Sequence, residues 1–145
     1  MSAVREACVP GLFTEKGSEQ GSDEGGAALL GARCRGCGTP YFPAPAHCRN
    51  PDCSASDLES SRFGGQGTLW SYSVANFAPP PPHRYDEPFK PYVIGVVDLD
   101  AGLRVVGQMV DGVGEVAVGC RVELVIAPLF HEGDKAVTSW KFKRI

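Results

Sequence analysis

The residues best suited to chemistry are four cysteines within about twenty positions, arranged as Cys34-Arg-Gly-Cys37 and Cys48-Arg-Asn-Pro-Asp-Cys53. Two close pairs of thiolates on two tight turns can surround one ion tetrahedrally, as in a closed structural Zn²⁺ site. Two disulfides, or four incidental thiols, would give the same pattern. Because four sulfur ligands leave no open coordination position, we expect the zinc to stabilise the fold and to take no part in catalysis. His47 could compete as a ligand, but we expect the thiols to hold the ion.

The remaining cysteines and histidines form no pattern typical of an enzyme. Cys120 lies at a Gly-Cys-Arg turn into an expected strand, where a cysteine usually serves as a small apolar side chain. No nucleophile elbow, phosphate-binding loop or pair of catalytic acids is present in the sequence. We therefore expect no catalytic residue in this chain. An enzyme that uses Cys8 or Cys120 as a nucleophile is the alternative.

Length and composition limit the class of protein. A chain of 145 residues with 43% hydrophobic content suits one domain, or a mini-domain attached to a small one. The content of 18 Gly and 12 Pro favours short strands and turns over long helices. A net charge of -3 argues against binding to phosphate backbones. We see neither a membrane-spanning run nor a secretory signal, and expect a cytoplasmic protein whose thiols stay reduced.

The first part of the chain divides into an arm, a tether and a zinc ribbon. Residues 1–28 contain a short apolar patch with Leu12 and Phe13, which we expect to dock on a partner, and an acidic Gly/Ser-rich tether at 17–26. An ordinary loose terminus is the alternative. Residues 29–62 are expected to form a rubredoxin-like zinc ribbon. There Tyr41 and Phe42 would cover the zinc site or face a partner, because so short a module has no core of its own.

Residues 63–145 show the alternation of a β domain. We expect strands at 68–74, 91–99, 103–110, 120–126 and 137–143, with a tight turn between the second and third. Glycines at 95 and 107 would allow strong curvature. Five strands in about eighty residues favour a small closed barrel of the OB-fold type. The predicted fold class is thus mostly β, with a zinc ribbon followed by a five-stranded barrel.

A Pro-rich loop at 77–91 interrupts the barrel and holds half of the prolines. Such a run can be neither a helix nor a central strand, and it loses little entropy on binding. We expect it to form a docking strip, although a loop that merely packs over the barrel mouth is the alternative. The residues expected to contact a partner are Phe77, Pro80, Pro81, His83, Tyr85 and Phe89.

The order of these motifs resembles the acyl-CoA-associated zinc-ribbon/OB-fold family. The similarity covers residues 29–145 and rests on the cysteine pairs, on Gly-x-Leu-Trp-Ser-Tyr-Ser-Val at 67–74 and on Pro-Tyr-Val-Ile-Gly-Val-Val-Asp-Leu-Asp at 91–100. Within the family, the chain looks most like the small zinc-finger subunits of benzoylsuccinyl-CoA thiolases, from anaerobic toluene breakdown. Many relatives have two residues between the second pair of cysteines, whereas this chain has Arg-Asn-Pro-Asp.

The resemblance implies a non-catalytic accessory subunit of a thiolase-type enzyme. It implies a thiolase-like catalytic partner in a hetero-oligomer, zinc held by the four paired cysteines, and a CoA thioester bound only in the partner's site. The alternative is a protein that binds single-stranded nucleic acid, because zinc ribbons and OB barrels also serve that function. The aromatic and basic residues that would do so are Trp70, Tyr72, Trp140, Lys141, Lys143 and Arg144.

Overall fold

The computed structural model describes residues 4–15, 26–55 and 57–145, and every regular element in it is a strand. Among these residues, no helix is long and apolar enough to cross a membrane. Almost all of the tether expected at 17–26 lies outside the described residues. The strands are β1 (Val4–Ala7), β2 (Phe13–Thr14), β3 (Ala28–Cys34), β4 (Pro40–Tyr41), β5 (Leu58–Gly64), β6 (Gln66–Ala75), β7 (Tyr92–Leu99), β8 (Arg104–Met109), β9 (Arg121–Glu132) and β10 (Lys135–Arg144).

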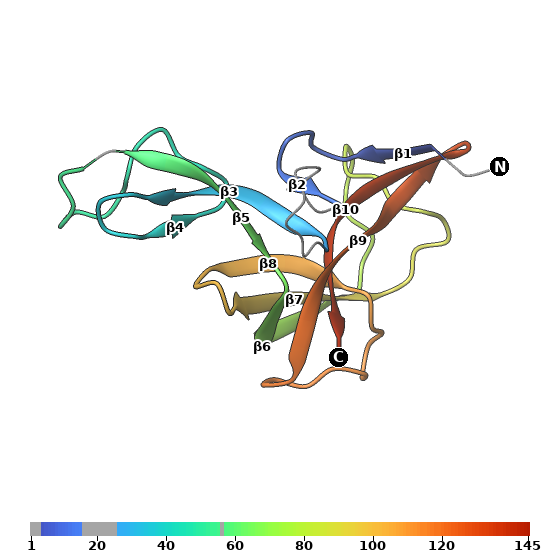
Figure 1. Ribbon diagram of the computed structural model, residues 1–145. Helices are drawn as coiled ribbons and strands as arrows, with labels where there is room; N and C mark the ends of the chain where they lie inside the picture. Colours follow the sequence, from blue (N-terminus) through green and yellow to red (C-terminus); the bar gives the residue numbers. More distant parts are fainter. Residues whose placement is uncertain (1–3, 16–25, 56) are drawn as a thin grey trace.

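The last five strands close into a barrel. They are hydrogen-bonded in the order β10, β8, β7, β6, β9, and β9 also pairs with β10, so that the sheet has no open seam. All of these pairs are antiparallel except β8 with β10, which is parallel at Gln108–Lys141 and Met109–Phe142. Figure 1 shows the barrel beside the more extended ribbon formed by β3, β4 and β5. The prediction of a five-stranded OB-fold barrel is confirmed.

Every second side chain of a barrel strand points inward, and these side chains fill the barrel interior. In β7, Val93, Val97 and Leu99 are buried, while Ile94, Val96 and Asp98 are half-exposed. Gly95 lies inside, where an added Cβ would come within 2.9 Å of both Leu69 Cδ1 and Met109 Sδ. A glycine at this position therefore leaves room for larger side chains from the neighbouring strands.

The zinc-ribbon half is built around β3. Strand β5 pairs with β3 along its whole length, and β2 and β4 share the opposite edge. Gly31 is required at the crossing with β4, because a Cβ there would lie 2.1 Å from the carbonyl oxygen of Tyr41. Strand β5 was not predicted: it carries a run of polar residues and buries only Phe63.

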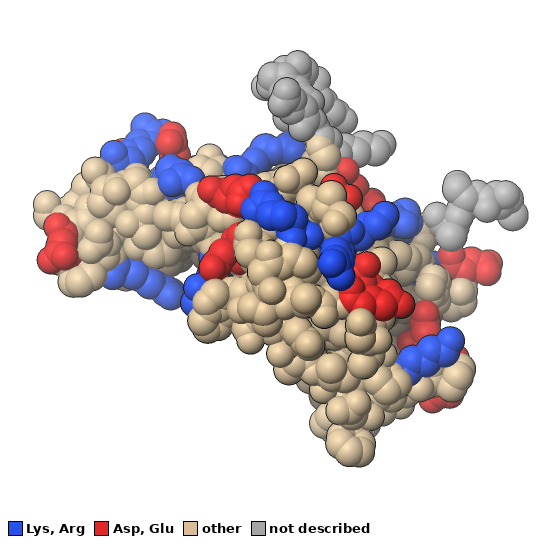
Figure 2. Space-filling view, turned by 90° about the horizontal axis from the view of Figure 1, so that it is seen from below, with Lys and Arg blue, Asp and Glu red and all other residues tan. Residues whose placement is uncertain are grey.

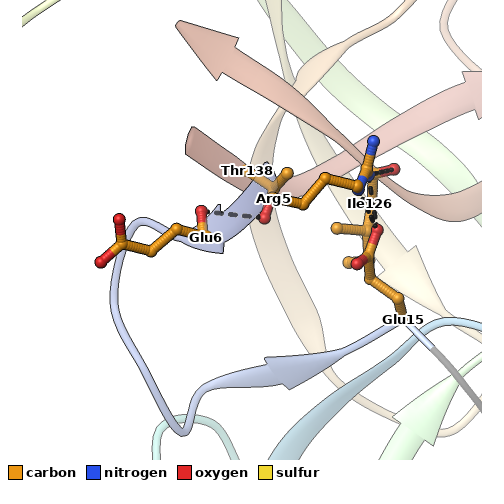
Figure 3. A network of polar contacts seen from close by, with 5 residues as sticks. All are labelled: Arg5, Glu6, Glu15, Ile126 and Thr138. Carbon is orange, nitrogen blue, oxygen red and sulfur yellow. Dashed lines mark hydrogen bonds and ion pairs between the residues drawn. The ribbon is translucent and has the colours of Figure 1, made fainter. Parts of the chain in front are cut away.

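Residues 4–15 are part of the folded unit. Strand β1 pairs in parallel with β10, and the Thr138 hydroxyl donates to the Glu6 carbonyl oxygen at 3.3 Å. Arg5 donates to the Glu15 carboxylate and to the Ile126 carbonyl, as Figure 3 shows. Phe13 is only 8% exposed and packs in the core, so the prediction that it docks on a partner is wrong. Leu12, the other half of that prediction, is half-buried against the same core.

Candidate metal centre and adjoining surfaces

The structure brings the four predicted sulfur atoms together. The Sγ atoms of Cys34 and Cys53 are 3.8 Å apart, those of Cys37 and Cys48 are 3.7 Å apart, and all four lie within 4.8 Å of one another. A tetrahedral Zn²⁺ with Zn–S bonds of about 2.3 Å separates its sulfurs by about 3.8 Å. The spacing therefore fits one tetrahedral ion. His47 is exposed and does not belong to the cluster.

Backbone amides shape the first knuckle around the sulfurs. The Gly38 amide donates to the Cys34 carbonyl at 2.9 Å, and the Gly36 amide donates to the Cys34 sulfur at 3.3 Å. Gly38 has a φ of 77°, in the left-handed region that glycine adopts without strain. On the second knuckle, the Cys53 amide donates to the Asn50 carbonyl at 3.0 Å. The four residues between Cys48 and Cys53 thus close a compact turn despite the longer spacing.

Two hydroxyl groups support the sulfur atoms from outside. Thr39 Oγ1 is 3.0 Å from Cys37 Sγ, and Tyr41 Oη is 3.3 Å from Cys48 Sγ. The Arg49 amide donates to Tyr41 Oη at 2.7 Å, which leaves the tyrosine hydroxyl proton for the sulfur. Such outer contacts orient the ligands of a metal site. Of the two positions expected for Tyr41, the structure shows the contact with the sulfur cluster, and contact with a partner stays a prediction.

The pKa values of the thiols depart from the ordinary value in opposite directions. The hydrogen bond with the Thr39 side chain is the main cause that lowers the pKa of Cys37 to about 6. Desolvation is the main cause that raises the pKa of Cys53 to about 12. A divalent cation among the sulfurs would favour four thiolates, so metal binding would release protons. The donor set and its spacing support a structural zinc ion.

The Pro-rich loop is fastened to the β9–β10 hairpin. The Asp86 carboxylate accepts from the His131 backbone amide at 2.7 Å and lies 2.6 Å from its ring Nδ1. These bonds lower the pKa of Asp86. Arg84 pairs with Glu132 and lies over the Phe130 ring. His131 lies near the end of β9.

Between this loop and the barrel lies a cavity of about 290 Å³. The rings of Tyr85, Phe89 and Tyr92 stand edge to face along it, with centroids 5.6 and 6.1 Å apart. Gln108 of β8 and Leu129 of β9 complete the wall on the barrel side. Tyr85 and Phe89, which were expected to contact a partner, thus line a cavity of the chain itself.

The other predicted docking residues divide into exposed and internal ones. Phe77 is 86% exposed, and Pro80, Pro81 and His83 are exposed on the same loop. Phe42, by contrast, is half-buried and packs edge to face on Trp140 at a centroid distance of 5.3 Å.

Three of the residues considered for nucleic-acid binding make contacts within the chain itself. Trp140 is half-buried and donates from Nε1 to the Val106 carbonyl at 2.9 Å, so its ring is not free to stack on bases. Arg144 donates to the Glu115 carbonyl at 2.9 Å. Trp70 is 53% exposed, but Arg104 covers its ring at 3.9 Å. On the face seen in Figure 2, basic and acidic side chains are interspersed and no continuous basic area is visible.

One residue that the sequence did not single out joins the two halves. Arg33 donates from Nη1 to the Gly38 carbonyl at 2.8 Å and from Nη2 to the Ala101 carbonyl at 3.3 Å. Gly38 belongs to the first knuckle, and Ala101 belongs to the turn between β7 and β8. The only feature of the sequence that could have pointed to Arg33 is its position directly before Cys34.

Comparison with known proteins supports the assignment of both the zinc ribbon and the OB-fold barrel. Residues 28–59 match the family described as ChsH2, rubredoxin-like zinc ribbon domain, and residues 61–127 match ChsH2, C-terminal OB-fold domain. The chain is 37% identical over 117 residues to a DUF35 domain-containing scaffold protein of Methanocaldococcus jannaschii, with 79% of each chain covered.

Two further relatives belong to named enzymes. The chain is 30% identical over 118 residues to the benzoylsuccinyl-CoA thiolase subunit BbsA of Thauera aromatica, covering 81% of this chain and 76% of BbsA. A solved structure, the Ltp2-ChsH2(DUF35) aldolase, superimposes with a TM-score of 0.62 at 27% identity, covering 81% of this chain and 84% of that one. The chain therefore belongs to the DUF35 family, and in it a rubredoxin-like zinc ribbon precedes an OB-fold domain.

Proposed function

We propose that the chain is a zinc-binding accessory subunit of a thiolase-type enzyme that acts on acyl-CoA thioesters. The observation that carries the proposal is the 30% identity, over most of both chains, to a protein named as a subunit of benzoylsuccinyl-CoA thiolase. A DUF35 chain in the structure of an aldolase and the relative named as a scaffold protein point to the same class of role. In this role the chain supplies binding surface and the partner supplies catalysis.

Zinc is held by Cys34, Cys37, Cys48 and Cys53, and it maintains the ribbon. The spacing of the sulfurs and their outer hydrogen bonds support this assignment. The acyl-CoA lies in the catalytic subunit's site, and this chain shapes that site from outside. A cytoplasmic location suits the proposal, because reduced thiols are needed to bind the metal.

The partner surface is centred on the exposed part of the Pro-rich loop, with Phe77 as its anchor. An aromatic side chain that is 86% exposed on a stiff segment can become fully desolvated at little entropic cost. Arg84 and Asp86 hold the far end of the loop against the β9–β10 hairpin, so the loop is held in place before binding. Within the acyl-CoA class, benzoylsuccinyl-CoA is the first substrate to test, because of the Thauera aromatica relative.

Co-expression with a thiolase-like protein of the same organism tests the proposal. We expect a stable complex in size-exclusion chromatography, and thiolysis of acyl-CoA that requires both chains. Phe77→Ser should weaken the complex about thirtyfold or more, because truncating an interface anchor costs about 2 kcal/mol or more. Val118→Ser is the matched control, since Val118 is also an exposed apolar residue but lies between β8 and β9. Absence of any complex, with thiolysis indifferent to this chain, would refute the proposal.

A further inference from the structure

We propose that zinc occupancy is transmitted from the ribbon to the barrel through Arg33 and the Tyr41–Phe42 step, so that the metal fixes the position of Trp140 and strand β8. The inference concerns this chain alone and does not depend on the identity of a partner. It rests on two bridges that both begin beside a zinc ligand and end on the barrel.

The first bridge runs through three aromatic side chains. Tyr41 Oη contacts the Cys48 sulfur at 3.3 Å, and the adjacent Phe42 packs on Trp140 with the rings at 87°. Trp140 in turn donates to the backbone carbonyl of Val106, in the middle of β8. A movement of the second knuckle therefore changes the packing against a ring that is bonded to a barrel strand.

The second bridge is the guanidinium group of Arg33. It binds the Gly38 carbonyl of the first knuckle and the Ala101 carbonyl of the barrel with different nitrogens. The same group lies 5.6 Å from the centroid of the Phe63 ring, which is fully buried. Because Gly38 also donates its amide to Cys34, the knuckle can lose its turn only by disturbing this bridge.

The metal is what keeps the starting points of both bridges in place. A cysteine knuckle is too small to hold its shape by burial, and its folding free energy comes from the ion. Strand β8 responds because its pairing with β10 is short, with Gln108 and Met109 opposite Lys141 and Phe142. Gln108 also lines the cavity beneath the Pro-rich loop, so the effect extends to that cavity.

A single-tryptophan protein makes the coupling measurable. The sequence has 2 tryptophans, so Trp70→Phe leaves Trp140 as the only tryptophan, whose emission is read under excitation selective for tryptophan. Zinc is removed with a chelator and returned by titration, with the metal counted by a colorimetric zinc assay. We expect Trp140 emission to shift on removal and to recover in proportion to bound zinc. Adding Phe42→Leu should preserve zinc binding but abolish most of the shift, whereas Phe77→Leu, at an exposed phenylalanine, should leave it unchanged.

Arg33→Gln provides a second, independent readout. It should leave stoichiometric zinc in place while faster amide hydrogen exchange appears in the turn around Ala101. The inference is overturned if Trp140 emission ignores zinc, or if the Phe42→Leu protein responds as fully as its parent. It is also overturned if Phe42→Leu does not fold and Arg33→Gln leaves exchange in that turn unchanged.

Discussion

Gly31→Ala probes the contact on which the shape of the ribbon depends. The added Cβ would lie 2.1 Å from the Tyr41 carbonyl oxygen and 3.0 Å from Phe63 Cε2. Carbon and carbonyl oxygen need about 3.3 Å, so β4 must retreat from β3 by about 1.2 Å. Backbone atoms cannot rotate away as a side chain can. We therefore expect the Ala32–Tyr41 pairing of β3 with β4 to open.

The size of the effect follows from what that opening breaks. Loss of one or two backbone hydrogen bonds costs about 1 kcal/mol each, and displacement of Phe42 from Trp140 costs about 1 kcal/mol more. The free energy of unfolding should fall by about 2–3 kcal/mol. Zinc should still bind, because the substitution changes none of the four thiols, but more weakly, because Tyr41 leaves Cys48.

Urea unfolding of the zinc-loaded protein measures this change, together with zinc affinity from competition with a chelator. Gly26→Ala is the control, since a Cβ at that position meets nothing within 4 Å. If Gly31→Ala unfolds within about 0.5 kcal/mol of the control, which is the range of ordinary surface substitutions, the reasoning from the close approach is refuted.

Two more predictions concern the metal and the loop. Cys48→Ser should release zinc and unfold the ribbon, because structural zinc supplies about 10–16 kcal/mol in small modules. Elemental analysis measures the bound metal, and Cys120→Ser is the control that should retain it. Stoichiometric metal in Cys48→Ser would contradict the ligand assignment. Asp86→Asn should loosen residues 83–91 at pH 7, as seen in amide hydrogen exchange by mass spectrometry. The pKa of Asp86 is lowered by His131, so its stabilising effect should be complete above the unfolded value near 3.9 and lost as pH falls through the lower folded pKa. Equal protection of the loop in both proteins at pH 7 would show that the contacts of Asp86 with His131 do not fasten it.

The zinc ribbon and the barrel could be predicted because their signals are local. The spacing of Cys34, Cys37, Cys48 and Cys53 already limits them to one small volume, and the structure places all four sulfurs there. Alternation along the barrel strands reports which side chains face inward, so all five strands were found, and four of them near their observed bounds.

The remaining features depend on contacts between distant parts of the chain. Strand β1 is exposed on most of its residues, and its partner, β10, lies more than a hundred positions away, so no periodicity marks it. Phe13 is buried where β2 pairs with β3, and its partner in that pairing, Leu29, lies beyond the segment expected to be a tether. Strand β9 continues through Pro128 to Glu132, beyond the expected end at 126. The proline is tolerated because β6 pairs only with residues 121–123 of that strand and because β10 has a bulge opposite.

Native mass spectrometry of the chain co-expressed with a thiolase-like protein of the same organism tests the account most directly, because one spectrum reports both metal and partner. The account predicts a hetero-oligomer in which each copy of this chain carries one zinc ion. A spectrum in which this chain is a monomer without zinc, with its cysteines joined as disulfides, would contradict the account.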